Sequence, residues 1–113
     1  MKIKEREKGN VVILDVSGKI VLGEDINSLK EKIDELLKAG KKNILLNLAD
    51  VPYVDSTGLG EIIRAYVSTT KNGGKLKLLK ISEKIKDLLV ISKLITTFEK
   101  NIFEDEEEAV NSF

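Results

Sequence analysis

The sequence predicts an α/β fold, a single domain over residues 1–113 with a mixed sheet of about five strands covered by about four helices. Runs rich in β-branched residues alternate along the chain with segments whose apolar residues recur every three or four positions. These are the patterns of strands and of amphipathic helices. The length of 113 residues, with 42% hydrophobic and 34% charged residues, suits one compact globular domain.

Two strands are predicted to open the chain. Residues 1–8 alternate weakly between polar and apolar and end at the turn-forming pair Gly9-Asn10, and residues 11–16 form a β-branched run. We therefore expect an antiparallel hairpin whose second strand is the more buried one. A loop follows over residues 19–23, with a short extended piece at its centre.

The first helix is predicted from residue 24 to about residue 38. Its apolar positions follow a 3.6-residue period, and Gly40 is a plausible stop. Glu24 and Asp25 suit the positive N-terminal end of such a helix. Residues 43–48 are a short apolar run, which we interpret as a central strand.

A second amphipathic helix follows and ends at the breaker over residues 71–74. Its stripe is formed by Leu59, Ile62, Ile63, Tyr66 and Val67. The rest of the chain predicts a strand over 75–81, a third helix capped by Ser82, a strand over 97–102 and a terminal helix over 105–113. Strands separated by helices indicate right-handed crossovers and mainly parallel pairing.

The segment over residues 50–60 is the candidate functional site, because it joins the end of an apolar strand to the start of a helix. Ligand sites of α/β sheets lie at the carboxyl ends of parallel strands. Ser56 or Thr57 falls where a helix N-cap is expected, and these residues equally suit ordinary capping. Gly58 and Gly60 would expose backbone N–H groups and admit a partner's backbone. A hydroxyl at this position also favours phosphate.

Composition excludes several chemistries. The chain has no cysteine and no histidine, which removes disulfides, zinc sites of the usual kind, thiol nucleophiles and histidine acid–base relays. Nineteen basic and nineteen acidic residues cancel, so direct binding of nucleic acid is not expected. We expect no cofactor, no metal and no enzymatic activity. No apolar run is long enough to span a bilayer and no secretory signal opens the chain, so we expect a cytoplasmic domain without membrane contact.

Three alternatives involve the same segment. A hydrolase with Ser56 as nucleophile lacks the histidine and the glycine two residues before the serine. A receiver-type signalling domain would be phosphorylated on Asp50 or Asp55, but it needs an acidic cluster for magnesium near its first strand. A carrier protein with a serine prosthetic arm would be all-helical, which the apolar strand-like runs disfavour.

The stretch Val54-Asp55-Ser56-Thr57-Gly58-Leu59-Gly60 resembles the phosphorylation loop of anti-sigma factor antagonists, the bacterial STAS domains. The resemblance covers essentially the whole chain. Its other parts are Gly18 with the following helix over 25–37, the turn Asn72-Gly73-Gly74, the segment 81–94, Phe98 and the acidic run 104–108. It implies a STAS-like fold for the single domain.

The resemblance also implies a function. In this family the unphosphorylated protein binds an anti-sigma factor, itself a serine kinase, and thereby frees the sigma factor. The kinase then phosphorylates the serine that corresponds to Ser56, with Thr57 as the other possible acceptor, and a PP2C-type phosphatase reverses the reaction. The implied contact residues are Asp55, Ser56, Thr57, Gly58, Leu59 and Gly60. Similar STAS domains also serve as scaffold subunits of larger sensory complexes, which stays open as an alternative.

One departure from the family affects the expected partner contacts. Many relatives carry an acidic residue soon after the glycine that corresponds to Gly18. Here the loop over 19–23 has none, and the acids come later, at Glu24 and Asp25.

Overall fold

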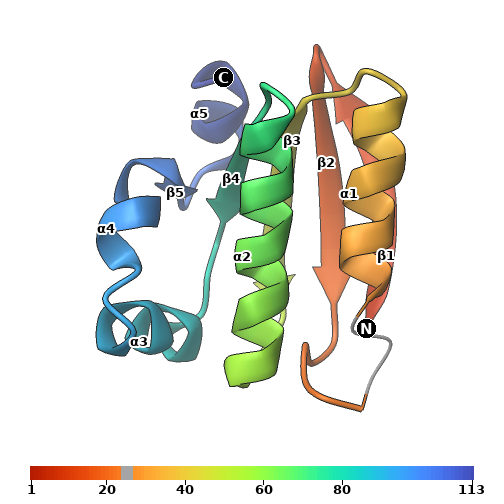
Figure 1. The fold of residues 1–113 in the computed structure, drawn as a ribbon. Coiled ribbons are helices and arrows are strands. Elements are labelled where there is room, and N and C mark those ends of the chain that lie inside the picture. The colour runs from red at the N-terminus through yellow and green to blue at the C-terminus, as the bar shows by residue number, and fades with distance from the viewer. Residues whose placement is uncertain (24–26) are drawn as a thin grey trace.

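A computed structural model describes residues 1–23 and 27–113, which adopt an α/β fold (Figure 1). Its strands are β1 (Lys2–Lys8), β2 (Val11–Ser17), β3 (Asn43–Asp50), β4 (Lys75–Leu79) and β5 (Ile102–Phe103). Its helices are α1 (Ser28–Lys38), α2 (Ser56–Lys71), α3 (Glu83–Ile91), α4 (Ile95–Phe98) and α5 (Glu106–Asn111), with a short 3-10 helix, η1 (Glu99–Asn101), after α4.

The sheet has five strands in the order β1-β2-β3-β4-β5. β1 pairs antiparallel with β2, and the other three pairs are parallel. The predicted hairpin and the predicted mixed sheet are therefore confirmed. Because β2, β3 and β4 run in the same direction, the loops that follow them emerge at one edge of the sheet, and the candidate segment lies at that edge.

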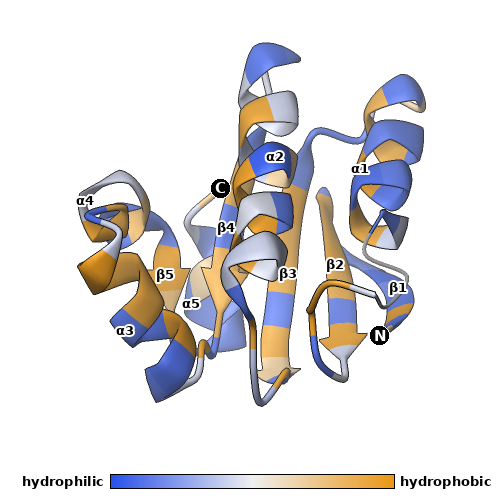
Figure 2. Cartoon of the chain, turned by 60° about the horizontal axis from the view of Figure 1, so that its bottom comes forward, coloured by the Kyte–Doolittle hydropathy of each residue, from blue (hydrophilic) through white to orange (hydrophobic). Residues whose placement is uncertain are grey.

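The two faces of the sheet are covered differently. Helices α1 and α2 pack on one face, where Leu14, Leu46 and Leu78 of the central strands are fully buried with Ile33 and Ile62. β2 and β3 are hydrophobic along most of their length in Figure 2, because both faces of these central strands are buried. The face covered by α1 and α2 holds most of the core.

The opposite face carries a smaller apolar cluster, which α5 covers. Ala109 packs there against buried side chains of β2, β3 and β4, namely Val11, Ile13, Leu45 and Leu79. Lys77 crosses this cluster: its ammonium lies 4.7 Å from the Phe113 ring centroid and 2.8 Å from the Ser112 carbonyl oxygen. Burial lowers the pKa of Lys77.

The structure corrects the prediction of a strand over 97–102. This segment forms α4 and η1, and only Ile102 and Phe103 pair with β4. The helical turn buries Phe98 to 1% exposure, where its ring meets Tyr66 edge-on at 4.8 Å between centroids. Packing of one aromatic side chain thus outweighs the β-propensity of the neighbouring threonines.

Three further boundaries differ from the prediction. β4 ends at Leu79 rather than at residue 81, because Lys80 takes a φ of 55° that a strand does not accommodate. α1 begins at Ser28 rather than at residue 24. The expected acidic start of that helix, Glu24 and Asp25, lies outside the described residues. The terminal helix is shorter than predicted, beginning at Glu106 with Asp105 as its N-cap.

An ionic network joins the first strand to the last helix. Arg6 donates to Asp15 on β2, with 2.7 Å between Nε and Oδ2, and to Glu106 on α5, with 3.0 Å between Nη1 and Oε2. Asn47 donates to the other oxygen of Asp15 at 2.8 Å. The Arg6 guanidinium lowers the pKa of Glu106 to about 2.

We predict that Glu106→Gln lowers the free energy of unfolding by about 1–2 kcal/mol at neutral pH, allowing for solvent screening. A depressed carboxyl pKa stabilises the fold above the unfolded value and loses this contribution as pH falls through the folded value. The difference in the free energy of unfolding between wild type and Glu106→Gln should therefore vanish as the pH falls from about 4.5 to about 2. Urea titrations across that range measure it. Glu107→Gln, an exposed neighbour, is the control, and equal effects of both variants would contradict the prediction.

Candidate functional site

Asp55 is the N-cap of α2. Its backbone is extended, with φ −87° and ψ −178°, and its Oδ1 accepts a hydrogen bond from the Gly58 N–H at 2.7 Å. This corrects the prediction that Ser56 or Thr57 caps the helix. The two residues instead occupy the first two helical positions, where both are exposed. Capping therefore does not account for the Ser56 hydroxyl.

Asp55 also joins the helix start to the loop that follows β2. Its second oxygen, Oδ2, accepts a hydrogen bond from the Leu22 N–H at 3.0 Å, and its own N–H lies 3.4 Å from the Ile20 carbonyl oxygen. The hydrogen bonds from Gly58 and Leu22 lower the pKa of Asp55. A fixed negative charge therefore stands directly before Ser56 in the chain.

Gly58 is required by packing within the chain. A Cβ at this position would lie 1.8 Å from the Ile20 carbonyl oxygen and 2.9 Å from Cγ1 of Val54. The space that the sequence analysis reserved for a partner's backbone is thus occupied by the loop after β2. At Gly60, in contrast, a Cβ would meet nothing within 4 Å.

The six predicted contact residues fall into two groups. Ser56 and Thr57 are exposed, and Asp55 and Gly60 are partly exposed. Gly58 and Leu59 are buried, and Leu59 belongs to the main core. The four exposed or partly exposed residues therefore offer surface to another molecule. The two buried residues pack inside the domain and support the turn.

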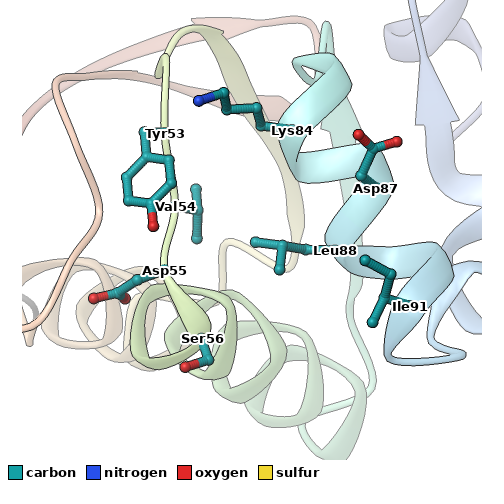
Figure 3. A pocket seen from close by; sticks show the side chains of 8 residues that line it. All are labelled: Tyr53, Val54, Asp55, Ser56, Lys84, Asp87, Leu88 and Ile91. Atoms are coloured by element: carbon teal, nitrogen blue, oxygen red, sulfur yellow. The ribbon is translucent and has the colours of Figure 1, made fainter.

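A groove runs beside Ser56, between the β3–α2 loop and α3 (Figure 3). Its volume is about 400 Å³. One wall is formed by residues 53–56 and the other by Lys84, Asp87, Leu88 and Ile91 of α3. Val54 and Leu88 point toward each other across it in Figure 3.

The part of α3 that lines this groove was not predicted from the sequence. Ile85 and Leu89 of that helix are buried, whereas Val90 and Ile91 are 52% and 77% exposed. The signal available in the sequence was the run of four consecutive aliphatic residues over 88–91, because one face of a helix cannot bury all four. The sequence alone does not show which other segment of the chain lies beside these residues.

Among the residues that the structure describes, no three acidic, histidine or cysteine side chains gather to hold a metal ion. Within the same residues, no helix combines the length and apolar character needed to cross a bilayer. What the site offers is an exposed hydroxyl at a helix start, an ionised neighbour and an adjacent groove.

We predict that Asp55→Ala lowers the free energy of unfolding more than loss of a simple N-cap does, because two chain segments lose a common acceptor. Asp105→Ala is the matched control, since Asp105 caps α5 through one hydrogen bond, from Glu108 at 2.9 Å. Urea unfolding measures both variants. Hydrogen exchange of the Leu22 amide should accelerate in Asp55→Ala, and an unchanged rate would contradict this account.

The fold and the site together define a class of small α/β domains. This class has an antiparallel first strand, a consecutive strand order and an exposed serine at the start of the helix after β3. Doubly wound receivers differ, because their strand order is 2-1-3-4-5. The receiver alternative therefore does not match the fold. The family model described as STAS domain matches residues 2–109, and the chain belongs to this family.

Two relatives named as anti-sigma factor antagonists are similar to this chain over most of their length. An anti-sigma-B factor antagonist of Bacillus subtilis is 32% identical over 97 residues, which are 83% of this chain and 84% of that protein. The crystal structure of a candidate anti-sigma factor antagonist from Thermotoga maritima has a TM-score of 0.86 at 27% identity, covering 97% of this chain and 92% of that one.

A third relative is similar in fold alone. The Bacillus cell fate determinant SpoIIAA in its phosphorylated form has a TM-score of 0.75 at 18% identity and covers 98% of both chains. The predicted resemblance to anti-sigma factor antagonists of the STAS family is thus confirmed by the family model and by these relatives.

Proposed function

We propose that this domain is an anti-sigma factor antagonist. Its unphosphorylated form binds an anti-sigma factor that is also a serine kinase, and this binding frees the sigma factor. The observation that carries the proposal is the exposed Ser56 at the first position of α2, left out of the cap by Asp55. The name of the 32%-identical Bacillus subtilis relative supports the same function.

Phosphorylation of Ser56 is the proposed off switch. A phosphate adds a charge of about −1.5 to −2 at pH 7. Within the domain this charge sits at the start of a 16-residue helix, whose free N–H groups and dipole tolerate it. Between the domain and a partner the same charge must lose its water beside the ionised Asp55, which disfavours the complex.

The other parts of the proposal follow from this switch. The kinase supplies the catalysis and a PP2C-type phosphatase removes the phosphate, so the chain itself acts as substrate and ligand rather than as an enzyme. No cofactor is needed for that role. The proposed location is the cytoplasm, where sigma factors direct transcription.

The experiment is phosphorylation by the source organism's own anti-sigma factor kinases, purified one by one and supplied with ATP. We expect one kinase to bind the domain and to transfer one phosphate, mapped to Ser56 by mass spectrometry. The phosphate should be stable in acid, as a phosphoserine is and a phosphoaspartate is not. Absence of both binding and transfer with every kinase would refute the function.

A further inference from the structure

We propose that the groove beside Ser56 receives an apolar side chain of the anti-sigma factor kinase, with Lys84 and Asp87 pairing with opposite charges around it. This inference rests on the proposed function and assigns α3 to the contact surface. No residue of α3 is part of the predicted contact turn. The partner is thereby defined by chemistry: a protein surface with one large apolar residue, an acidic residue on one side and a basic residue on the other.

The first argument is the distribution of exposed apolar side chains. Among the described residues, the large apolar side chains with substantial exposure are Leu22, Tyr53, Val67, Val90 and Ile91. Tyr53 and Ile91 line the groove, at 40% and 77% exposure. Leu22, at 73%, is hydrogen-bonded to Asp55 through its backbone N–H. Exposed apolar surface thus gathers around Ser56, which is typical of an interaction site.

The second argument is the reach of a kinase. To phosphorylate Ser56 a kinase must place its active site over that hydroxyl. A stable protein interface covers about 800 Å² per partner, a patch with a radius of roughly 16 Å. Ser56 itself lines the groove, so any such patch centred on Ser56 includes the groove. The kinase is therefore the occupant that the position of the groove favours.

The third argument is the shape and chemistry of the groove. A volume of about 400 Å³ accommodates a large side chain such as phenylalanine or leucine, and Tyr53 and Leu88 supply apolar contact from opposite walls. The hydrophobic stretches of α3 are visible in Figure 2. Burial of Tyr53 and Ile91 by a partner is the kind of contact that dominates binding energy.

Charge at the groove restricts the partner further. Lys84 and Asp87 are three residues apart on α3 and therefore share a face of the helix. The ammonium of Lys84 lies 5.5 Å from the centroid of the Tyr53 ring. When a partner removes water from these two charges, each needs an opposite charge to remain favourable. Charge reversal at Lys84 should therefore weaken binding, and high salt should reduce the difference.

The test compares Ile91→Ser with Val90→Ser. Both residues are exposed at the end of α3, so both variants should fold, but only Ile91 lines the groove. Calorimetric titration of each unphosphorylated variant with the kinase that phosphorylates Ser56 measures Kd. We expect Kd to rise at least tenfold for Ile91→Ser and to stay within twofold for Val90→Ser. Lys84→Glu should also raise Kd, less so at 0.5 M salt.

Each outcome decides a different question. If wild type binds and is phosphorylated on Ser56 while Ile91→Ser binds within twofold of wild type, the groove proposal is wrong and the proposed function stands. If wild type shows neither binding nor phosphorylation, both fail. Sedimentation of the chain alone tests whether a second copy of the chain occupies the groove instead. If the wild type forms an oligomer that Ile91→Ser does not form, and the Kd for the kinase is unchanged, the groove binds a second copy and the proposal is wrong.

Discussion

Gly58→Ala is expected to lower the free energy of unfolding by about 3 kcal/mol or more. The added methyl group would lie 1.8 Å from the Ile20 carbonyl oxygen, a backbone atom that no side-chain rotation can move away. Either the loop after β2 or the first turn of α2 must shift, and both alternatives strain the hydrogen bonds of Asp55. Overpacking against backbone lies at the upper end of such effects.

Gly60→Ala is the matched control, two positions along the same helix. A methyl group there meets nothing within 4 Å, and replacing a helical glycine by alanine stabilises by about 0.5–1 kcal/mol. Urea unfolding of both variants gives the comparison, and the two changes should have opposite signs. Equal stability of the two variants would show that the contact between Gly58 and Ile20 is not as close as described.

Ser56→Asp is expected to weaken binding of the anti-sigma factor kinase at least tenfold, equivalent to about 1.4 kcal/mol, without lowering the melting temperature by more than a degree or two. The carboxylate would stand at the first position of α2, where the helix dipole favours it. At an interface the same charge would have to lose its water directly beside the ionised Asp55, so desolvation is unfavourable.

Ser56→Ala and Thr57→Asp are the controls for this variant. Ser56→Ala should bind like wild type, because the N-cap formed by Asp55 is intact. It should accept no phosphate at this position, because the hydroxyl is absent. Thr57→Asp tests whether any negative charge in the first turn has the same effect. Calorimetric titration and a thermal melt are measured for each variant. Phosphorylation of Ser56→Ala would make Thr57 the candidate acceptor, and tight binding of Ser56→Asp would remove Ser56 as the switch.

Local patterns in the sequence were enough to predict most of the fold. The β-branched and apolar runs correspond to β2 and β3, and the period of three to four residues corresponds to α1 and α2. These elements form the centre of the domain, where burial dictates residue type at nearly every position. The stripe on α2 is less uniform than its period implies, because Ile62 is fully buried while Val67 remains 42% exposed.

The exact start of α2 could not be predicted locally. Asp55, Ser56 and Thr57 are all good N-caps, so their order alone does not select one. The structure shows why the aspartate is favoured: its second oxygen also receives the N–H of Leu22, which is 33 positions away in the sequence. A serine or threonine has one side-chain oxygen and would serve this pair of donors less well.

The C-terminal part and the groove depend on contacts between distant segments. Thr96 and Thr97 favour a strand by composition, yet Phe98 packs against Tyr66 on α2 and the segment takes a helical turn. Similarly, Ile91 lines the groove together with Tyr53, which lies 38 positions earlier in the sequence. Pairings of this kind carry no periodic signal in one sequence.

The double role of the Asp55 carboxylate has a consequence for the speed of signalling. Because Gly58 and Leu22 already hold this turn in one conformation, a partner meets a pre-organised surface and loses little backbone entropy in binding it. Recognition then resembles rigid-body docking, without a slow rearrangement before the complex forms. Under the proposed function, the response time would then be set by molecular encounter and by phosphate chemistry.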